Sequence, residues 1–223
     1  MSKLNKDKKS CRDVFNAFML SNVDYAGNLE IPIINLSTSE PTELISFSKI
    51  NKCTEYNKWV HFYEHDYIIE RICKYPEKYL QKLKQFKGVI TPDFSLYRDM
   101  PFTMQINNIF RSHQIGRWLQ NEGIDVITNI RYGDDRTYKI ACLGVPKHST
   151  VAIGTYGSIK DKENRKYLEA GLPIVFNTIR PKTLVIYGSV TALIKDLCQK
   201  YNTQLIVFQS ELGKTHDNTK EVK

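Results

Sequence analysis

The stretch GVITPDFSLYRDMP, residues 88–101, joins a short apolar run to a segment rich in reactive side chains. Asp93 carries a carboxylate that could move a proton or bind a divalent cation. Tyr97 follows four residues later and could orient a ligand. An apolar strand followed by such residues is typical of the loops at which parallel α/β proteins bind ligands. Asp93 could instead cap a turn, which is the commoner role, and the sequence leaves both roles open.

Polar residues also follow other predicted strands. Asn129 lies just inside the end of the strand predicted over residues 124–130, and Arg131 directly follows it. Arg131 and Arg165 carry planar guanidinium groups that could clamp a phosphate group through two hydrogen bonds. Surface arginine is the commoner role for both. If these side chains share one site, we expect Asn129, Arg131 and Arg165 to position an anion.

Two similar turns, TYGS at 155–158 and YGS at 187–189, place Gly-Ser between a predicted strand and a helix. Backbone N–H groups at such turns can bind phosphate. The candidate ligand-binding residues in these turns are Thr155, Gly157, Ser158, Gly188 and Ser189. Neither turn matches a Walker loop or a GxGxxG motif, so ordinary turn formation is the alternative.

The long helix predicted after Pro101 carries a polar stripe. Gln105, Asn108 and Ser112 share one helical face by their spacing. Near the start of the helix, this stripe could reach the loop cluster, where Gln105 and Asn108 would orient a ligand. A plain solvent-facing surface is the alternative.

The segment HFYEH, residues 61–65, matches the H-x-x-E-H spacing of one class of zinc peptidase. That chemistry needs both histidines on one helical face. Here a strand is predicted to end near Tyr63, and Asp66 begins a helix. Alternation along the strand then places His61 and Tyr63 on one face and His65 in the loop. We therefore expect neither a zinc peptidase nor any structural zinc.

Strand and helix signals alternate along the chain. Predicted strands cover residues 31–36, 44–50, 58–63, 88–91, 124–130, 149–155, 183–188 and 204–210. Predicted helices cover residues 67–75, 76–86, about 101–123, 137–144, 161–171 with a stop at Gly171, and 189–202 with Ser189 as cap. This order predicts an α/β fold with a parallel sheet of repeated βα units, barrel-like or a partly closed barrel. An open doubly wound sheet is the alternative.

The composition fits one large domain. We expect a flexible basic arm over residues 1–29, a single α/β domain over 30–210 and a flexible tail over 211–223. The formal net charge of +8 and the pI of about 9.1 favour an anionic partner such as a nucleotide or nucleic acid. The five cysteines lack CxxC spacing, so neither a disulfide framework nor a cysteine zinc site is indicated.

The sequence contains no apolar run of the ~18 residues that would span a membrane. The N-terminal residues lack the apolar core of a signal peptide. We therefore expect no membrane contact and a cytoplasmic location, with reduced thiols.

Four segments carry a family resemblance: WVHFYEHDYIIE, FKGVITPDFSLYRDMPFTMQINNIFR, VAIGTYGS and LVIYGS. Through them the chain resembles an uncharacterised domain-of-unknown-function family, family 4417, over most of residues 30–210. The resemblance implies a context of bacteria, phages and mobile genetic elements. It implies no catalytic residue, because the family has no established activity.

The leading hypothesis is a protein that binds a phosphate-bearing ligand, a nucleotide or nucleic acid, at the carboxyl ends of the strands. Hydrolase or nuclease chemistry would then use Asp93. The sequence identifies no cofactor, although a divalent cation could serve as one. The alternative is a non-enzymatic accessory protein that binds a host or phage protein or nucleic acid. Its support is the basic charge and three aromatic residues expected to be exposed, Tyr132, Tyr138 and Tyr156.

Overall fold

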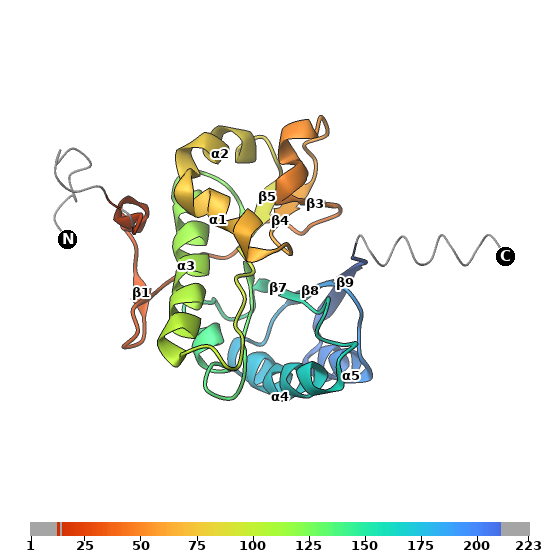
Figure 1. Ribbon diagram of the computed structural model, residues 1–223. Coiled ribbons are helices and arrows are strands. Elements are labelled where there is room, and N and C mark those ends of the chain that lie inside the picture. Colours follow the sequence, from red (N-terminus) through yellow and green to blue (C-terminus); the bar gives the residue numbers. More distant parts are fainter. Residues whose placement is uncertain (1–12, 14, 211–223) are drawn as a thin grey trace.

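A seven-stranded parallel sheet forms the centre of the computed structural model, which describes residue 13 and residues 15–210. The strands lie in chain order, β3-β4-β5-β6-β7-β8-β9, and the sheet curls into a half-barrel with helices on its outside (Figure 1). This confirms the predicted α/β fold and the partly closed barrel. An open doubly wound sheet would instead reverse its strand order partway.

The elements follow the predicted alternation, with somewhat shorter strands. The strands of the half-barrel are β3 (Leu44–Ser46), β4 (Trp59–His61), β5 (Gly88–Ile90), β6 (Val126–Asn129), β7 (Thr150–Gly154), β8 (Thr183–Tyr187) and β9 (Gln204–Phe208). The α-helices are α1 (Asp66–Lys74), α2 (Pro76–Leu83), α3 (Phe102–Asn121), α4 (Lys162–Ile179) and α5 (Ala192–Tyr201). The 3₁₀ helices are η1 (Ala17–Leu20), η2 (Phe47–Lys52) and η3 (Ile140–Cys142). A separate antiparallel pair consists of β1 (Tyr25–Ala26) and β2 (Ile31–Pro32).

Both faces of the curled sheet are apolar, for different reasons. The outward residues of the strands, such as Val60 and Val151, pack under the helices. The inward residues, such as Ile90, Ile127 and Val185, pack against one another inside the half-barrel. A strand that is covered on both sides must be apolar on both sides, which explains the continuous apolar runs in the sequence.

One end of the half-barrel is covered by the segment before β3. Thr38 donates to the carboxylate of Asp125, just before β6, at 2.8 Å. Glu40 accepts a hydrogen bond from Thr183, the first residue of β8, at 2.5 Å. This segment therefore crosses the amino ends of the strands, and the polar loops that follow the strands gather at the opposite end.

The prediction that a helix stops at Gly171 is wrong, because α4 continues through Gly171 and Pro173 to Ile179. A Cβ atom at Gly171 would lie 2.5 Å from the ring of Tyr132. The glycine therefore lets the Tyr132 ring pack closely against the middle of α4, and it does not mark a helix end.

Three other boundaries also differ from the prediction. The cap of α5 is Thr191, whose Oγ1 accepts a hydrogen bond from the backbone of Ile194 at 3.4 Å, and not Ser189. The strand predicted over residues 44–50 turns into η2 after Ser46. The short helix predicted over 137–144 is the 3₁₀ turn η3.

The described part of the predicted N-terminal arm lies against α3. The ring of Phe18 packs edge-on against Trp118 at a centroid distance of 6.2 Å, and Met19 is buried. Gln114 donates a hydrogen bond to the carbonyl oxygen of Phe15 at 3.0 Å. The rest of the predicted arm and the predicted tail 211–223 lie outside the described residues.

Candidate functional site

Asp93, Asn129 and Arg131 come together where β5 and β6 end. The side-chain amide of Asn129 donates to Asp93 Oδ1 at 2.7 Å. Nη1 of Arg131 lies 3.7 Å from Asp93 Oδ2. Because β5 and β6 are parallel neighbours, residues just after each strand meet at one edge of the sheet. The strand-end reasoning therefore selected three residues that the fold brings into contact.

Aromatic side chains line the inner face of the half-barrel beside this cluster. Tyr63 stacks on Tyr187 from β8, with ring centroids 4.7 Å apart and an interplanar angle of 10°. His61 packs against both rings, at 5.4 Å from Tyr63 and 4.6 Å from Tyr187. The Tyr63 hydroxyl donates to Asn129 Oδ1 at 3.1 Å. The prediction that His61 and Tyr63 share a face is confirmed.

Sequence reasoning did not include His61, Tyr63 or Tyr187 among the candidate site residues. For the first two a signal was present, since they alternate toward the carboxyl end of an inner strand. Tyr187 could have been suggested by its position just before a Gly-Ser turn. Its contact with Tyr63 depends on the curl of the sheet, which no local pattern encodes.

The carboxyl group of Asp93 is shielded from water, with 15% of the side chain exposed. Burial raises its pKa, and the negative charge of Asp66 adds to this rise. The charge of Arg131 and the hydrogen bond from Asn129 act in the opposite direction, but the pKa remains raised overall. A carboxyl group with a raised pKa exchanges its proton closer to neutral pH than a free carboxyl group does.

The neighbouring rings keep their uncharged forms. Burial lowers the pKa of His61 to about 3. Nδ1 of His61 accepts a hydrogen bond from the Tyr63 backbone at 3.2 Å, so its proton lies on Nε2. Burial and the charge of Asp93 raise the pKa of Tyr63 well above its usual value. Tyr63 is therefore a phenol, and its hydroxyl is a hydrogen-bond donor.

Arg131 uses little of its hydrogen-bonding capacity. Its side chain is 30% exposed, and no described residue accepts a hydrogen bond from its buried Nε. A small pocket beside it has a volume of about 10 Å³, which is enough for one water molecule. Its lining includes Asn108, Ser112, His113 and Asn129. A larger anion must therefore approach Arg131 from the exposed side.

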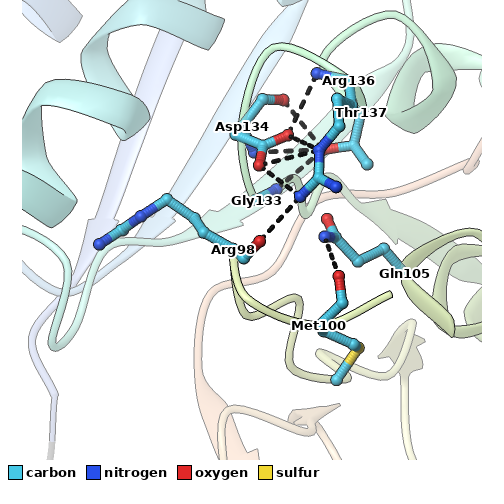
Figure 2. A network of polar contacts seen from close by, with 7 residues as sticks. All are labelled: Arg98, Met100, Gln105, Gly133, Asp134, Arg136 and Thr137. Atoms are coloured by element: carbon cyan, nitrogen blue, oxygen red, sulfur yellow. Dashed lines mark hydrogen bonds and ion pairs between the residues drawn. The ribbon is translucent and has the colours of Figure 1, made fainter. Parts of the chain in front are cut away.

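A polar clamp holds the loop after β5 against the loop after β6 (Figure 2). Arg136 pairs with Asp134 at 2.7 Å and donates to the carbonyl oxygen of Arg98 at 2.8 Å. Gln105 donates to the carbonyl oxygen of Met100 at 3.0 Å. The loop that begins at Asp93 is thus fixed near its far end.

The other predicted ligand-binding residues lie in three kinds of place. Tyr97 lies in the loop after β5 with 59% of its surface exposed. Gln105 is fully buried in the clamp, and Asn108 donates to the carbonyl oxygen of Ser95 at 2.8 Å, so both support the loop after β5. Arg165 lies on α4 and bonds Glu169 at 2.9 Å.

The two predicted Gly-Ser turns lie against each other. Oγ1 of Thr155 donates to the carbonyl oxygen of Ser189 at 2.7 Å. A Cβ atom at Gly188 would lie 2.6 Å from that same Oγ1, and Gly188 has a φ of +126°. Gly157 also has a positive φ, and the backbone of Ser158 donates to the Thr155 carbonyl at 3.1 Å. The two turns therefore hold each other in place after β7 and β8.

Two aromatic residues expected to be exposed are buried, so that prediction is wrong for Tyr132 and Tyr138. Their hydroxyl groups donate to the carbonyl oxygens of Leu168 and Tyr167, under α4. The physical reason is the space that Gly171 leaves for their rings. Tyr156 is 48% exposed, as expected.

Among the described residues, no group of three or more His, Cys, Asp or Glu side chains is placed to hold a metal ion. In the HFYEH segment, Glu64 accepts a hydrogen bond from the backbone of Ser48, and His65 stacks on Tyr67. Within the described part of the chain, no helix is both long and apolar enough to cross a membrane.

Comparisons with known proteins place the chain beside phage proteins. A family model described as domain of unknown function (DUF4417) matches residues 23–209, so the resemblance inferred from the sequence is confirmed. The Gene 1 protein of Mycobacterium phage L5 is 34% identical over 131 residues, covering 59% of this chain and 57% of that protein. The Gene 1 protein of Mycobacterium phage D29 is 31% identical over 163 residues, covering 71% of this chain and 60% of that protein. The chain thus spans less than two thirds of these relatives, and no solved structure matches it significantly.

Proposed function

The chain belongs to the DUF4417 family of phage-associated proteins, and we propose that it binds a phosphate-bearing ligand, a nucleotide or nucleic acid, at the carboxyl ends of its strands. In this proposal Arg131 pairs with the phosphate and Asp93 transfers a proton in its hydrolysis. The observation that carries the proposal is a partly exposed arginine with unused N–H groups beside a buried carboxyl group.

Arg131 is suited to an anion because its one charged partner among residues 13 and 15–210 is loosely placed. The separation of 3.7 Å from Asp93 exceeds that of a strong charge-assisted hydrogen bond. The guanidinium group therefore keeps donors for a second anion, and the net charge of +8 attracts such ligands to the protein.

Asp93 is better suited to proton transfer than to cation binding. Its carboxylate already faces the N–H groups of Asn129 and the positive charge of Arg131, and both disfavour a cation there. In the proposed step Asp93 accepts a proton from the attacking water while that water's oxygen bonds to phosphorus. The bond from phosphorus to the leaving oxygen breaks, and that oxygen takes a proton from solvent.

Two exposed rings in the loops after β5 and β7 favour a nucleotide over a simpler phosphate ester. Tyr97 is four residues beyond Asp93, and Tyr156 is two residues beyond Gly154. A Cβ atom at Gly154 would lie 3.5 Å from Asp93 Oδ2, so the chain length alone places Tyr156 close to the site. Exposed aromatic rings stack with bases, and each such contact contributes ~1–3 kcal/mol.

Calorimetry with a nucleoside 5′-monophosphate and with ribose 5-phosphate tests the proposal. We expect Arg131→Gln to weaken the binding of both compounds by about tenfold or more, because a charge-assisted hydrogen bond is lost. Arg165→Gln removes the same charge from a side chain that is paired within α4, and it serves as the matched control. Asp93→Asn should keep binding but lose phosphate release.

Three results would count against this function. They are no binding of either compound by the wild-type protein, equal binding by Arg131→Gln, and equal weakening in the Arg165→Gln control. Binding of a single-stranded oligonucleotide without any turnover would instead favour the non-enzymatic alternative. Its affinity should then fall steeply between ~50 and 200 mM salt.

A further inference from the structure

A chain of two hydrogen bonds links Tyr63 to the buried carboxyl group. The Tyr63 hydroxyl donates to Oδ1 of Asn129 at 3.1 Å, and Nδ2 of Asn129 donates to Oδ1 of Asp93 at 2.7 Å. The second oxygen of Asp93, Oδ2, faces Arg131 at 3.7 Å. The two carboxylate oxygens therefore have different surroundings.

We propose that Tyr63 and Asn129 are positioning residues, which hold Asp93 through Oδ1 and leave Oδ2 as the oxygen that exchanges protons and meets a ligand. The inference rests on the proposed function only for the role of Asp93 in proton transfer. The arrangement itself is a property of the protein without ligand.

The hydroxyl of Tyr63 determines which way the Asn129 amide points. A phenol that donates to the amide oxygen leaves the amide NH₂ group directed at Asp93. An NH₂ group stabilises the ionised carboxylate, whereas an amide oxygen in its place would favour the protonated acid. Without the hydroxyl the amide can turn either way, so protonation of Asp93 becomes easier.

Space for Oδ2 comes from Gly154 on β7. Any side chain there would approach both the ring of Tyr63 and Asp93 Oδ2, at 2.7 and 3.5 Å for a Cβ atom. Tyr63 is also fixed by its stacking on Tyr187. The ring is therefore rigidly placed, and loss of its hydroxyl should change the hydrogen bond without moving the ring.

Within the part of the chain that the structure describes, three titratable or charged groups from the surrounding elements interact with Asp93. These are Tyr63 after β4, Asp66 at the start of α1 and Arg131 after β6. Since Tyr63→Phe changes none of the charges on Asp66 or Arg131, a change in the titration of Asp93 reports on the hydrogen-bond chain.

The test is a pH titration of the Asp93 carboxyl carbon by ¹³C NMR on the full chain, with the signal assigned by its absence in Asp93→Asn. We expect Tyr63→Phe to raise the midpoint by about one pH unit, a tenfold gain in proton affinity, as for the loss of one hydrogen bond to the charged form. Tyr132→Phe removes the hydroxyl of another buried tyrosine, which bonds Leu168, and should leave the midpoint unchanged.

A second variant shows whether Tyr63 acts through the amide. Asn129→Ala should raise the midpoint on its own, and adding Tyr63→Phe to it should raise it no further. An unchanged midpoint in Tyr63→Phe, an equal shift in Tyr132→Phe, or a further shift in the double variant would overturn the inference. The NMR titration is made without ligand, so its outcome does not depend on phosphate binding. A failure of phosphate binding would therefore refute the proposed function alone.

Discussion

Gly154→Ala is expected to disturb the packing of the candidate site. The added Cβ atom would lie 2.7 Å from two carbons of the Tyr63 ring. Ordinary contact begins near 3.4 Å, so the ring would have to move by about 0.7 Å. The same methyl group would lie 3.5 Å from Asp93 Oδ2, in ordinary contact.

The ring of Tyr63 cannot make that movement without losing other contacts. It lies against Gly154 and also packs against the rings of Tyr187 and His61. Its hydroxyl is bonded to Asn129 at 3.1 Å. Overpacking of this kind lowers the free energy of unfolding by ~1–3 kcal/mol. Because Gly154 does not have a positive φ, the cost arises from packing and not from backbone strain.

Urea unfolding of a double-mutant cycle measures this cost. Gly154→Ala is compared in the wild-type background and in Tyr63→Ala, where the ring is absent. We expect a loss of ~1–3 kcal/mol in the first background and nearly none in the second. Equal losses in both backgrounds would show that the ring is not the obstacle, and the packing of the site inferred here would be wrong.

Three further predictions concern the charges around the site. Burial raises the pKa of Asp93 above its usual 3.8, so the free energy of unfolding of the wild-type protein should fall as the pH rises from 3.8 through the raised pKa. Urea unfolding at pH 4 and 7 should therefore show that Asp93→Asn gains stability relative to wild type at the higher pH. Burial lowers the pKa of His113 from 6.5 to about 4, so the free energy of unfolding should fall by ~3 kcal/mol as the pH drops from 6.5 to 4. In His113→Asn the free energy of unfolding should fall less over the same pH range. Arg136→Ala should open the clamp, and hydrogen exchange should then quicken at Arg98 and Met100 but not in α5.

The fold could be predicted from the sequence because its signals are local and repeated. Each apolar run with flanking turn residues became a strand, and the order of strands and helices selected a parallel sheet. The errors occurred where tertiary packing changed the meaning of one residue. Gly171 has the appearance of a helix end in the sequence, but the ring of Tyr132 needs its small size within α4. No local pattern contains that ring.

The candidate site was partly predictable for a related reason. Asp93, Asn129 and Arg131 lie at or just after the ends of neighbouring strands, so the rule that parallel strands end together was sufficient to group them. Gln105 and Asn108 have the right residue types and spacing, but they bond to carbonyl oxygens of the loop after β5. A polar stripe on a helix predicts hydrogen bonds, and the sequence cannot say whether a ligand or a loop accepts them.

The aromatic wall of the site shows why the remainder was hidden. Tyr63 follows β4 and Tyr187 ends β8, and four strand spacings of ~4.8 Å would separate them by ~19 Å in a flat sheet. Their ring centroids are 4.7 Å apart, so the curl of the sheet brings them together. Tyr63 in turn orients Asn129, which holds Asp93. The chemistry proposed for Asp93 therefore depends on closure of the half-barrel, and a change that flattened the sheet would disable the site without touching any residue near the carboxyl group.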